Sequence, residues 1–129
     1  MNPMPMDLGV CGVEQMLYAG TVKYNDTGVA TGIKLCDLPA NIIVTRAVAV
    51  ITTAFNAGTT NVLTVGANDG IDDLLGSSDI TEDTAAAYSK QTFAKYTEKK
   101  AIKAKFTQTG TAATAGAADI YLFVVRIPE

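Results

Sequence analysis

The sequence contains no histidine and no tryptophan, and this absence bears first on catalysis. Histidine is the commonest general base and the commonest metal ligand, so neither role has its usual residue. No Ser–His–Asp or Cys–His pair can form, and no GxxxxGK loop or strand-following GxGxxG is present. The sequence therefore argues against an enzyme and indicates no catalytic residue, no cofactor site and no metal ligand.

Cysteine is also scarce, with Cys11 and Cys36 as the two examples. Two isolated cysteines make neither a disulfide framework nor a metal site. Cys36 follows apolar Ile33 and Leu35, which predicts a buried free thiol. Nothing near Cys11 in the sequence could activate its thiol, so we expect no reactive role there.

Charged residues make up only 18% of the chain, below the usual quarter, and the net charge is −3. A chain of this charge lacks the basic face that general nucleic-acid binding needs. The charge is unevenly spread, with net −7 over residues 1–83 and net +4 over residues 84–129. Either the two parts meet as solvated loops when the chain folds back, or they make complementary contacts between neighbouring copies.

Long hydrophobic runs are absent too. The longest apolar stretch, NIIVTRAVAVITTAF at residues 41–55, is shorter than the roughly 20 residues of a membrane helix and carries Arg46. Isoleucine, valine and threonine fill most of it, and these stiff side chains favour strands. Both alternating faces are apolar, which predicts a long strand with a core on one side and a neighbour or partner on the other. We therefore expect no membrane insertion and a homo-oligomer; a trimer is one option, and the sequence does not give the number of copies.

The rest of the chain reads as further short strands separated by Gly-rich turns. Together with 41–55, about seven to eight such elements predict an all-β fold, an antiparallel β-sandwich or a barrel-like variant of it. The strand candidates are residues 16–24, 29–35, 61–65, 91–96, 100–107 and 118–127.

The segment between residues 81 and 99 has two interpretations. Asp79 and Glu82 could form a capping box ahead of three alanines, which allows at most one short helix near 82–90. A single helix over 84–105 is the rival. The strict alternation of apolar and lysine residues over 100–107 weighs against that rival.

An acidic run occupies residues 69–83, within the sequence NDGIDDLLGSSDITED that starts at Asn68. Its carboxylate oxygens could hold Ca²⁺. Its spacing does not match an EF-hand loop. A solvated loop with Asx turns is the simpler interpretation, and the lysines at 90–105 are read in the same way as a solvated face. The aromatic residues among those lysines are attributed to core packing.

Residues 1–15 read as an extended N-terminal arm, ahead of a single β-sandwich domain at 16–129. The arm combines proline and glycine with apolar residues, and it is either a frayed end or a segment that orders against a partner protein. It lacks the basic start and apolar core of a signal peptide, so we expect synthesis in the cytoplasm. The candidate partner contacts are Met4, Met6, Leu8, Val10 and Val13.

Three stretches carry a resemblance to a known group of proteins. They are DLPANIIVTRAVAVITTAFNAGTTNVLTVG at residues 37–66, DDLLGSSDIT at 72–81 and GAADIYLFVVRIPE at 116–129. This order of strands and loops resembles small virion structural proteins of tailed bacteriophages. The resemblance covers roughly residues 29–127, leaves the arm out and carries no catalytic signature.

The resemblance implies a non-enzymatic protein that works by assembly, most simply a decoration protein on the outer surface of a phage head. Its expected partners are the major capsid protein or other virion proteins, and its expected location is the capsid surface. A tail or fibre component is the first alternative. A carbohydrate-binding β-sandwich is an alternative of another class, although sugar sites usually use exposed aromatic platforms and this chain has no tryptophan.

Overall fold

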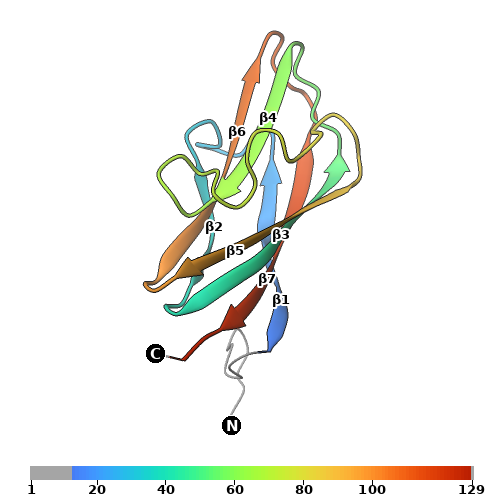
Figure 1. Ribbon diagram of the computed structural model, residues 1–129. Helices are drawn as coiled ribbons and strands as arrows, with labels where there is room; N and C mark the ends of the chain where they lie inside the picture. The colour runs from blue at the N-terminus through green and yellow to red at the C-terminus, as the bar shows by residue number, and fades with distance from the viewer. Residues whose placement is uncertain (1–12, 129) are drawn as a thin grey trace.

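The computed structural model describes residues 13–128, and this range contains seven strands and no helix (Figure 1). Four strands form one antiparallel sheet in the order β1-β7-β3-β5, and three form a second in the order β2-β6-β4. The predicted all-β sandwich is therefore confirmed. The strands are β1 (Glu14–Lys23), β2 (Ile33–Leu38), β3 (Ile42–Thr53), β4 (Thr60–Gly66), β5 (Ala87–Tyr96), β6 (Lys100–Thr109) and β7 (Ala117–Arg126).

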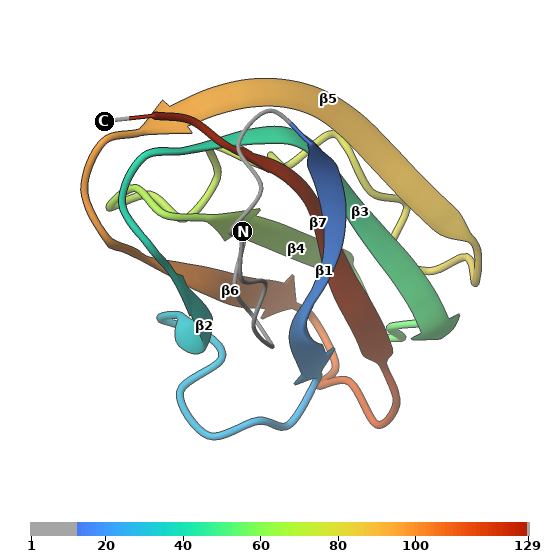
Figure 2. The same cartoon turned by 90° about the horizontal axis from the view of Figure 1, so that it is seen from below.

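The two sheets lie against each other as layers, and the core fills the space between them (Figure 2). Every second side chain of β6 and β7 points into this space, as the period of a strand requires. Phe55 and Phe106 meet there with ring centroids 4.6 Å apart, inside the preferred range for aromatic pairs. The inward residues of β7, which lies between β1 and β3, are Ala118, Ile120, Leu122 and Val124, all fully buried.

Strand β3 does not keep one alternation of inward and outward side chains along its whole length. Val44 pairs with Val124 of β7, but Arg46 already pairs with Phe123, so Thr45 is an extra residue that forms a bulge. The Thr45 hydroxyl donates to the Phe123 carbonyl at 3.1 Å. The alternation therefore changes phase at the bulge, and the core receives Ile42, Val44, Ala47, Ala49 and Ile51.

Strand β4 lies at an edge of the small sheet, and the loop 67–86 covers that edge. Val65 exchanges hydrogen bonds with Leu75, its N–H donating to the Leu75 carbonyl at 3.0 Å and its carbonyl accepting from the Leu75 N–H at 2.9 Å. Two positions earlier, the Leu63 N–H donates to the Glu82 carboxylate at 2.8 Å. The loop thus occupies donors and acceptors that would otherwise invite another strand.

Two predicted elements differ in the structure. Residues 82–86 form turns and β5 begins at Ala87, so the short helix near 82–90 is not formed. The reason is that the Glu82 carboxylate turns inward to β4 while Tyr88 pairs with Ala49 of β3. The second difference is that β2 begins at Ile33 instead of residue 29.

The late start of β2 follows from a tight turn. Gly28 has φ 83°, a left-handed conformation that glycine adopts readily, and its carbonyl accepts the Gly32 N–H at 2.9 Å. The turn leaves Val29 buried, and its carbonyl accepts the Phe106 N–H from β6. Val29 therefore joins the core from a loop. Its apolar side chain alone could not show whether it lay in a loop or in a strand.

Candidate docking surface on the four-stranded sheet

The four-stranded sheet presents a second apolar surface on the side away from the core, which we call the outer face. The strand register arranges its outward side chains in four rows that run from β1 through β7 and β3 to β5. The rows are Glu14, Val125, Ile43 and Lys95; Met16, Phe123, Arg46 and Gln91; Tyr18, Tyr121, Val48 and Ser89; and Thr21, Asp119, Val50 and Ala87.

Large apolar side chains on the outer face are exposed to solvent. Met16 is 63% exposed and Tyr18 is 53% exposed. A groove of about 440 Å³ runs along the face and contains no acidic residue. Its lining consists of Met16, Arg46, Val48, Val50, Ala87, Ser89, Tyr121 and Phe123. A contiguous apolar surface of this kind marks a contact site more often than a solvated one.

The side chains of the outer face already hold one another in place. The rings of Tyr18 and Tyr121 lie 5.4 Å apart, and the Arg46 guanidinium lies 5.9 Å from the centre of the Phe123 ring. These distances are typical of aromatic pairs and of cation–π contacts. Side chains ordered before docking lose less entropy when a partner arrives, so the face is suited to binding.

Polar groups on the outer face find partners within the sheet. The Thr21 hydroxyl donates to the Asp119 carboxylate at 2.6 Å and also bonds with the Tyr18 hydroxyl. The Thr45 hydroxyl donates to the Glu14 carboxylate. These bonds satisfy polar groups in the two outermost rows, Glu14 in the first and Thr21 and Asp119 in the fourth. The two middle rows are mainly apolar on β1 and β7, and their polar residues are Arg46, Gln91 and Ser89.

The charges of the four rows balance. Glu14 and Asp119 are the acidic members of the four rows, and Arg46 and Lys95 are the basic members. Glu14 lies on the edge strand β1, whereas Lys95 lies in the same row on the opposite edge strand β5. Lys23, which pairs with Ala117 one row beyond the fourth, adds one positive charge at the end of β1.

A second bulge exposes Phe93 at the β5 edge. Val44 pairs with Ala94 and Arg46 with Gln91, so Thr92 and Phe93 together oppose the single residue Thr45. Phe93 has φ 46°, an uncommon conformation for a bulky residue, and is 64% exposed. The prediction that Phe93 packs in the core is wrong, because the bulge turns its side chain away from the inward-facing residues of β5.

The other aromatic residues near the lysines do belong to the interior. Phe106 is 1% exposed and Tyr96 is 8% exposed, while Tyr88 is half-buried against the core. The Tyr96 hydroxyl donates to the Asp73 carboxylate at 2.8 Å. Burial raises the pKa of Tyr96, and its bond to Asp73 adds to the shift, so this hydroxyl stays protonated and acts as a structural donor.

The predicted arm contacts mostly lie beyond the described range. Met4, Met6, Leu8 and Val10 are outside the described residues, so their role stays a prediction. Val13 is described, immediately before β1, and is 48% exposed. Strand β1 begins at Glu14, two residues before the predicted start of the strand at residue 16.

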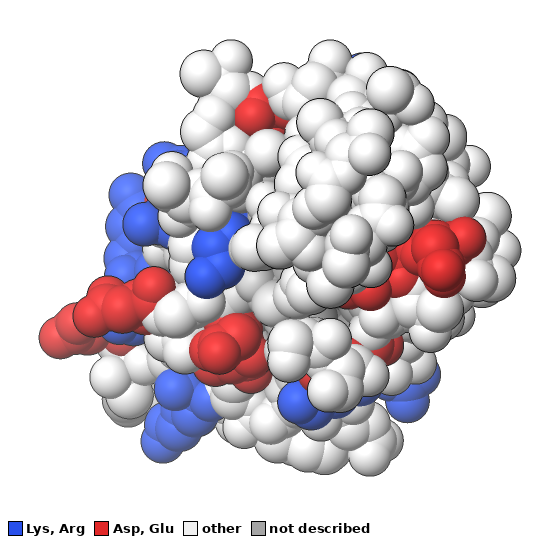
Figure 3. Space-filling view, turned by 90° about the horizontal axis from the view of Figure 1, so that it is seen from above, with Lys and Arg blue, Asp and Glu red and all other residues white. Residues whose placement is uncertain are grey.

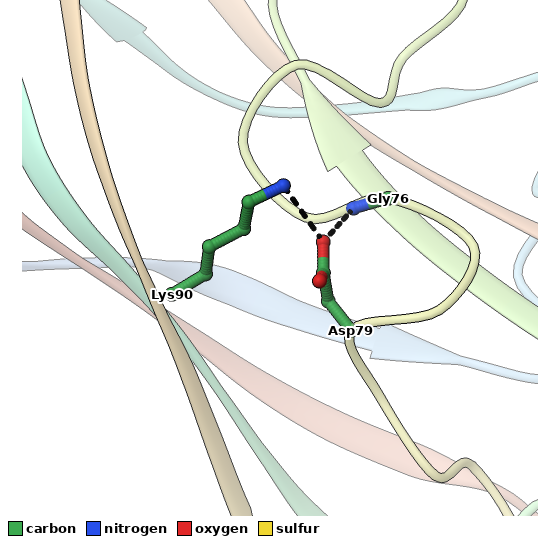
Figure 4. Close-up of polar contacts among 3 residues, drawn as sticks. All are labelled: Gly76, Asp79 and Lys90. Carbon is green, nitrogen blue, oxygen red and sulfur yellow. Dashed lines mark hydrogen bonds and ion pairs between the residues drawn. The ribbon is translucent and has the colours of Figure 1, made fainter.

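The acidic run uses its carboxylates to hold its own loop. Asp79 accepts the Gly76 N–H at 2.7 Å and the Lys90 ammonium at 3.1 Å, which ties the loop to β5 (Figure 4). Asp73 accepts the Ala67 N–H at 2.7 Å. Within residues 13–128 no three potential ligands are grouped as a metal site would require. The hydrogen bonds match the interpretation of this run as a loop held by its own polar groups. The loop is only partly solvated, because Leu74 and Leu75 are fully buried.

Glu82 and Cys36 are the remaining chemically distinctive side chains. Glu82 is 7% exposed, and burial raises the pKa of its carboxyl even though the Leu63 N–H hydrogen-bonds to it. Cys36 is a free, half-buried thiol whose pKa is raised, first by burial and then by the charge of Asp37. A raised pKa reduces the thiolate fraction and makes this cysteine unreactive.

The end of the molecule where β4 begins and β6 ends is uncharged. Figure 3 looks onto this end and shows a broad surface without charged side chains, with lysine and acidic residues around its sides. It consists of the loops 54–59 and 110–116, which we call the distal loops. The Asn56 carbonyl oxygen accepts the N–H groups of Thr114 and Ala115, and its amide donates to the Thr114 hydroxyl. Asn56 therefore joins the two loops into one firm end.

Comparison with known proteins places the fold among phage capsid structures. No protein-family model matches the chain, and no curated protein matches it. A chain in the capsid asymmetric unit of cyanophage Pam1 has a TM-score of 0.69 at 19% identity, covering 93% of this chain and 89% of that one. A chain in the capsid of Ralstonia phage GP4 has a TM-score of 0.61 at 18% identity, covering 100% and 92%.

A third similar structure comes from another host. A chain in the acidic stable capsid structure of Helicobacter pylori bacteriophage KHP30 has a TM-score of 0.59 at 16% identity, covering 93% of this chain and 97% of that one. The similarity extends over nearly the whole length of each chain. At these identities it shows a shared fold.

Proposed function

We propose that this chain is a non-enzymatic structural protein of a tailed-phage virion and that it decorates the outer surface of the head. The observation that carries the proposal is the similarity of fold, over nearly the whole chain, to chains found in three phage capsids. The resemblance of residues 37–66 to small virion proteins supports the proposal independently, because the resemblance rests on the sequence pattern and not on the fold.

The described residues suit a mechanical role. A continuous core fills the sandwich, and the loop 67–86 covers the β4 edge. At this edge the chain therefore offers side chains for contact instead of unpaired backbone groups. The N-terminal and C-terminal ends of the described chain lie at one end, and the distal loops lie at the other (Figure 1). Many copies on a symmetric shell would gain affinity by multivalency even where each contact is weak. The expected partner is the major capsid protein or another virion protein.

A reconstitution experiment tests the proposal. Purified full-length protein is added to phage shells from which it has been removed, or to shells assembled without it, and the mixture is sedimented. We expect saturable co-sedimentation and a higher melting temperature of the loaded shells. Shells that neither bind the protein nor change in stability would contradict the decoration role.

Localisation separates the head from the tail. Gold-labelled antibody against the protein, applied to intact virions, is expected to mark heads over their whole surface. Labelling confined to tails or fibres would instead support the first alternative role.

A further inference from the structure

We propose that the outer face of the four-stranded sheet is the contact between two copies of this chain, which pack face to face about a two-fold axis. This inference goes beyond the decoration role and does not depend on it, because it concerns self-association in solution. The partner that fills the groove, whose lining extends from Met16 to Ala87, is a second copy of this chain.

The size of the outer face fits such a contact. Strand spacing and rise give four strands and four rows an area of roughly 20 by 25 Å. This corresponds to roughly 500 Å² on each copy before the relief of the side chains is counted, near the ~600 Å² per partner at the lower end of specific interfaces. The groove, with Val48, Tyr121 and Phe123 in its lining, supplies the apolar centre that such interfaces have. Exposed Met16 and Tyr18 continue this apolar surface onto the edge strand β1.

Charge complementarity selects the second copy as partner. A two-fold axis parallel to the strands places β1 over β5 of the second copy and keeps each row opposite itself. Glu14 then lies over Lys95 of the second copy, and the symmetric pair forms at the other edge. In the same arrangement Arg46 lies over Phe123 of the second copy, so the two arginines of the dimer do not face each other. No two like charges face each other across this contact.

The outer face of the three-stranded sheet lacks this complementarity. Its outward residues include Lys34, which pairs in register with Lys103, and Lys105 lies two positions further along β6. A second copy approaching that face would meet lysines with lysines. Self-association therefore favours the four-stranded sheet, where the charges of the four rows sum to zero and Glu14 and Lys95 occupy opposite edges.

Sedimentation velocity of the full-length protein over a range of concentrations tests the proposal. We expect the wild-type protein to form a dimer and V48E to reduce the association constant at least tenfold, because Val48 lines the centre of the groove. T107E on the outer side of β6 is the matched control, and we expect it to associate as the wild type does. Circular dichroism melting checks that both variants remain folded.

Charge reversal at exposed positions tests the two-fold arrangement itself. E14K and K95E are each expected to weaken association severalfold, since each creates two like-charge pairs, and the double variant is expected to recover it. A wild-type monomer at every concentration, a trimer, or a V48E variant that associates as T107E does would overturn the proposal. So would a monomeric wild type whose shell binding V48E abolishes, because the outer face would then belong to the shell.

Discussion

The outward faces of the two sheets differ in a way that separates their roles. The three-stranded sheet turns Lys34, Lys103 and Thr107 to solvent, and Lys34 forms an ion pair with Asp37 at 2.7 Å. The four-stranded sheet instead turns Met16 and its neighbouring aromatic residues outward. Both sheets share one core, so the core cannot explain the difference. The first face therefore suits contact with water, and the second is the one that we propose for contact with another copy.

The largest effect is expected where two neighbouring residues of β7 belong to different faces. Leu122 is fully buried in the core, whereas Tyr121 lies on the outer face. We expect L122A to lower the free energy of unfolding by about 2–5 kcal/mol, because it leaves a cavity. Y121A should cost about 1 kcal/mol or less in the monomer and should act mainly on association. Urea denaturation at low protein concentration compares the two, and equal losses would contradict the assignment of the faces.

A smaller effect is expected at the covered edge of β4. Glu82 is the acceptor for the buried Leu63 N–H. E82A should lower the free energy of unfolding by roughly 1–3 kcal/mol, since this donor loses its partner. E82Q keeps an oxygen acceptor and serves as the control, with a stability close to that of the wild type. Equal losses in E82A and E82Q would show that the charge matters and that the hydrogen bond does not.

The same residue predicts an unusual pH dependence. Burial raises the pKa of the Glu82 carboxyl in the folded protein above its unfolded value. The folded state therefore binds this proton more tightly, so the contribution of Glu82 to stability increases as pH falls through the folded pKa and decreases as pH rises. Urea midpoints taken from about pH 7 down to about pH 4.5 should show the wild type gaining stability relative to E82Q. A constant or opposite difference would contradict the burial of this charge.

The smallest effect is expected on the solvated face. The hydrogen bond from Lys34 lowers the pKa of Asp37, but both side chains are exposed and water screens their attraction. K34A should therefore leave the urea midpoint and the association constant unchanged within error. A clear loss of association in K34A would mean that the three-stranded sheet also makes contacts, and the distinction between the faces would no longer hold.

Much of the candidate site could be anticipated from the pattern of β3. The stretch 41–55 is apolar on both faces, which predicts burial on one side and contact on the other, and the outer face bears Ile43, Val48 and Val50 as that pattern requires. The pattern did not show which residues beyond Thr45 face the core, because a bulge moves every later side chain to the opposite face. The bulge depends on contacts with β5 and β7, which are distant in sequence.

Local chemistry alone determined that this chain forms short strands with Gly-rich turns, an apolar β3 and a lysine face on β6. Those features arise from side chains within a few residues of one another, through strand period and turn conformation. Tertiary structure alone decided the rest. Strands β1, β7, β3 and β5 come from four separate parts of the chain, and the outer face exists only in their order and register. Glu82 likewise became a cap for β4 instead of a helix start, because the Leu63 N–H needed an acceptor 19 residues away.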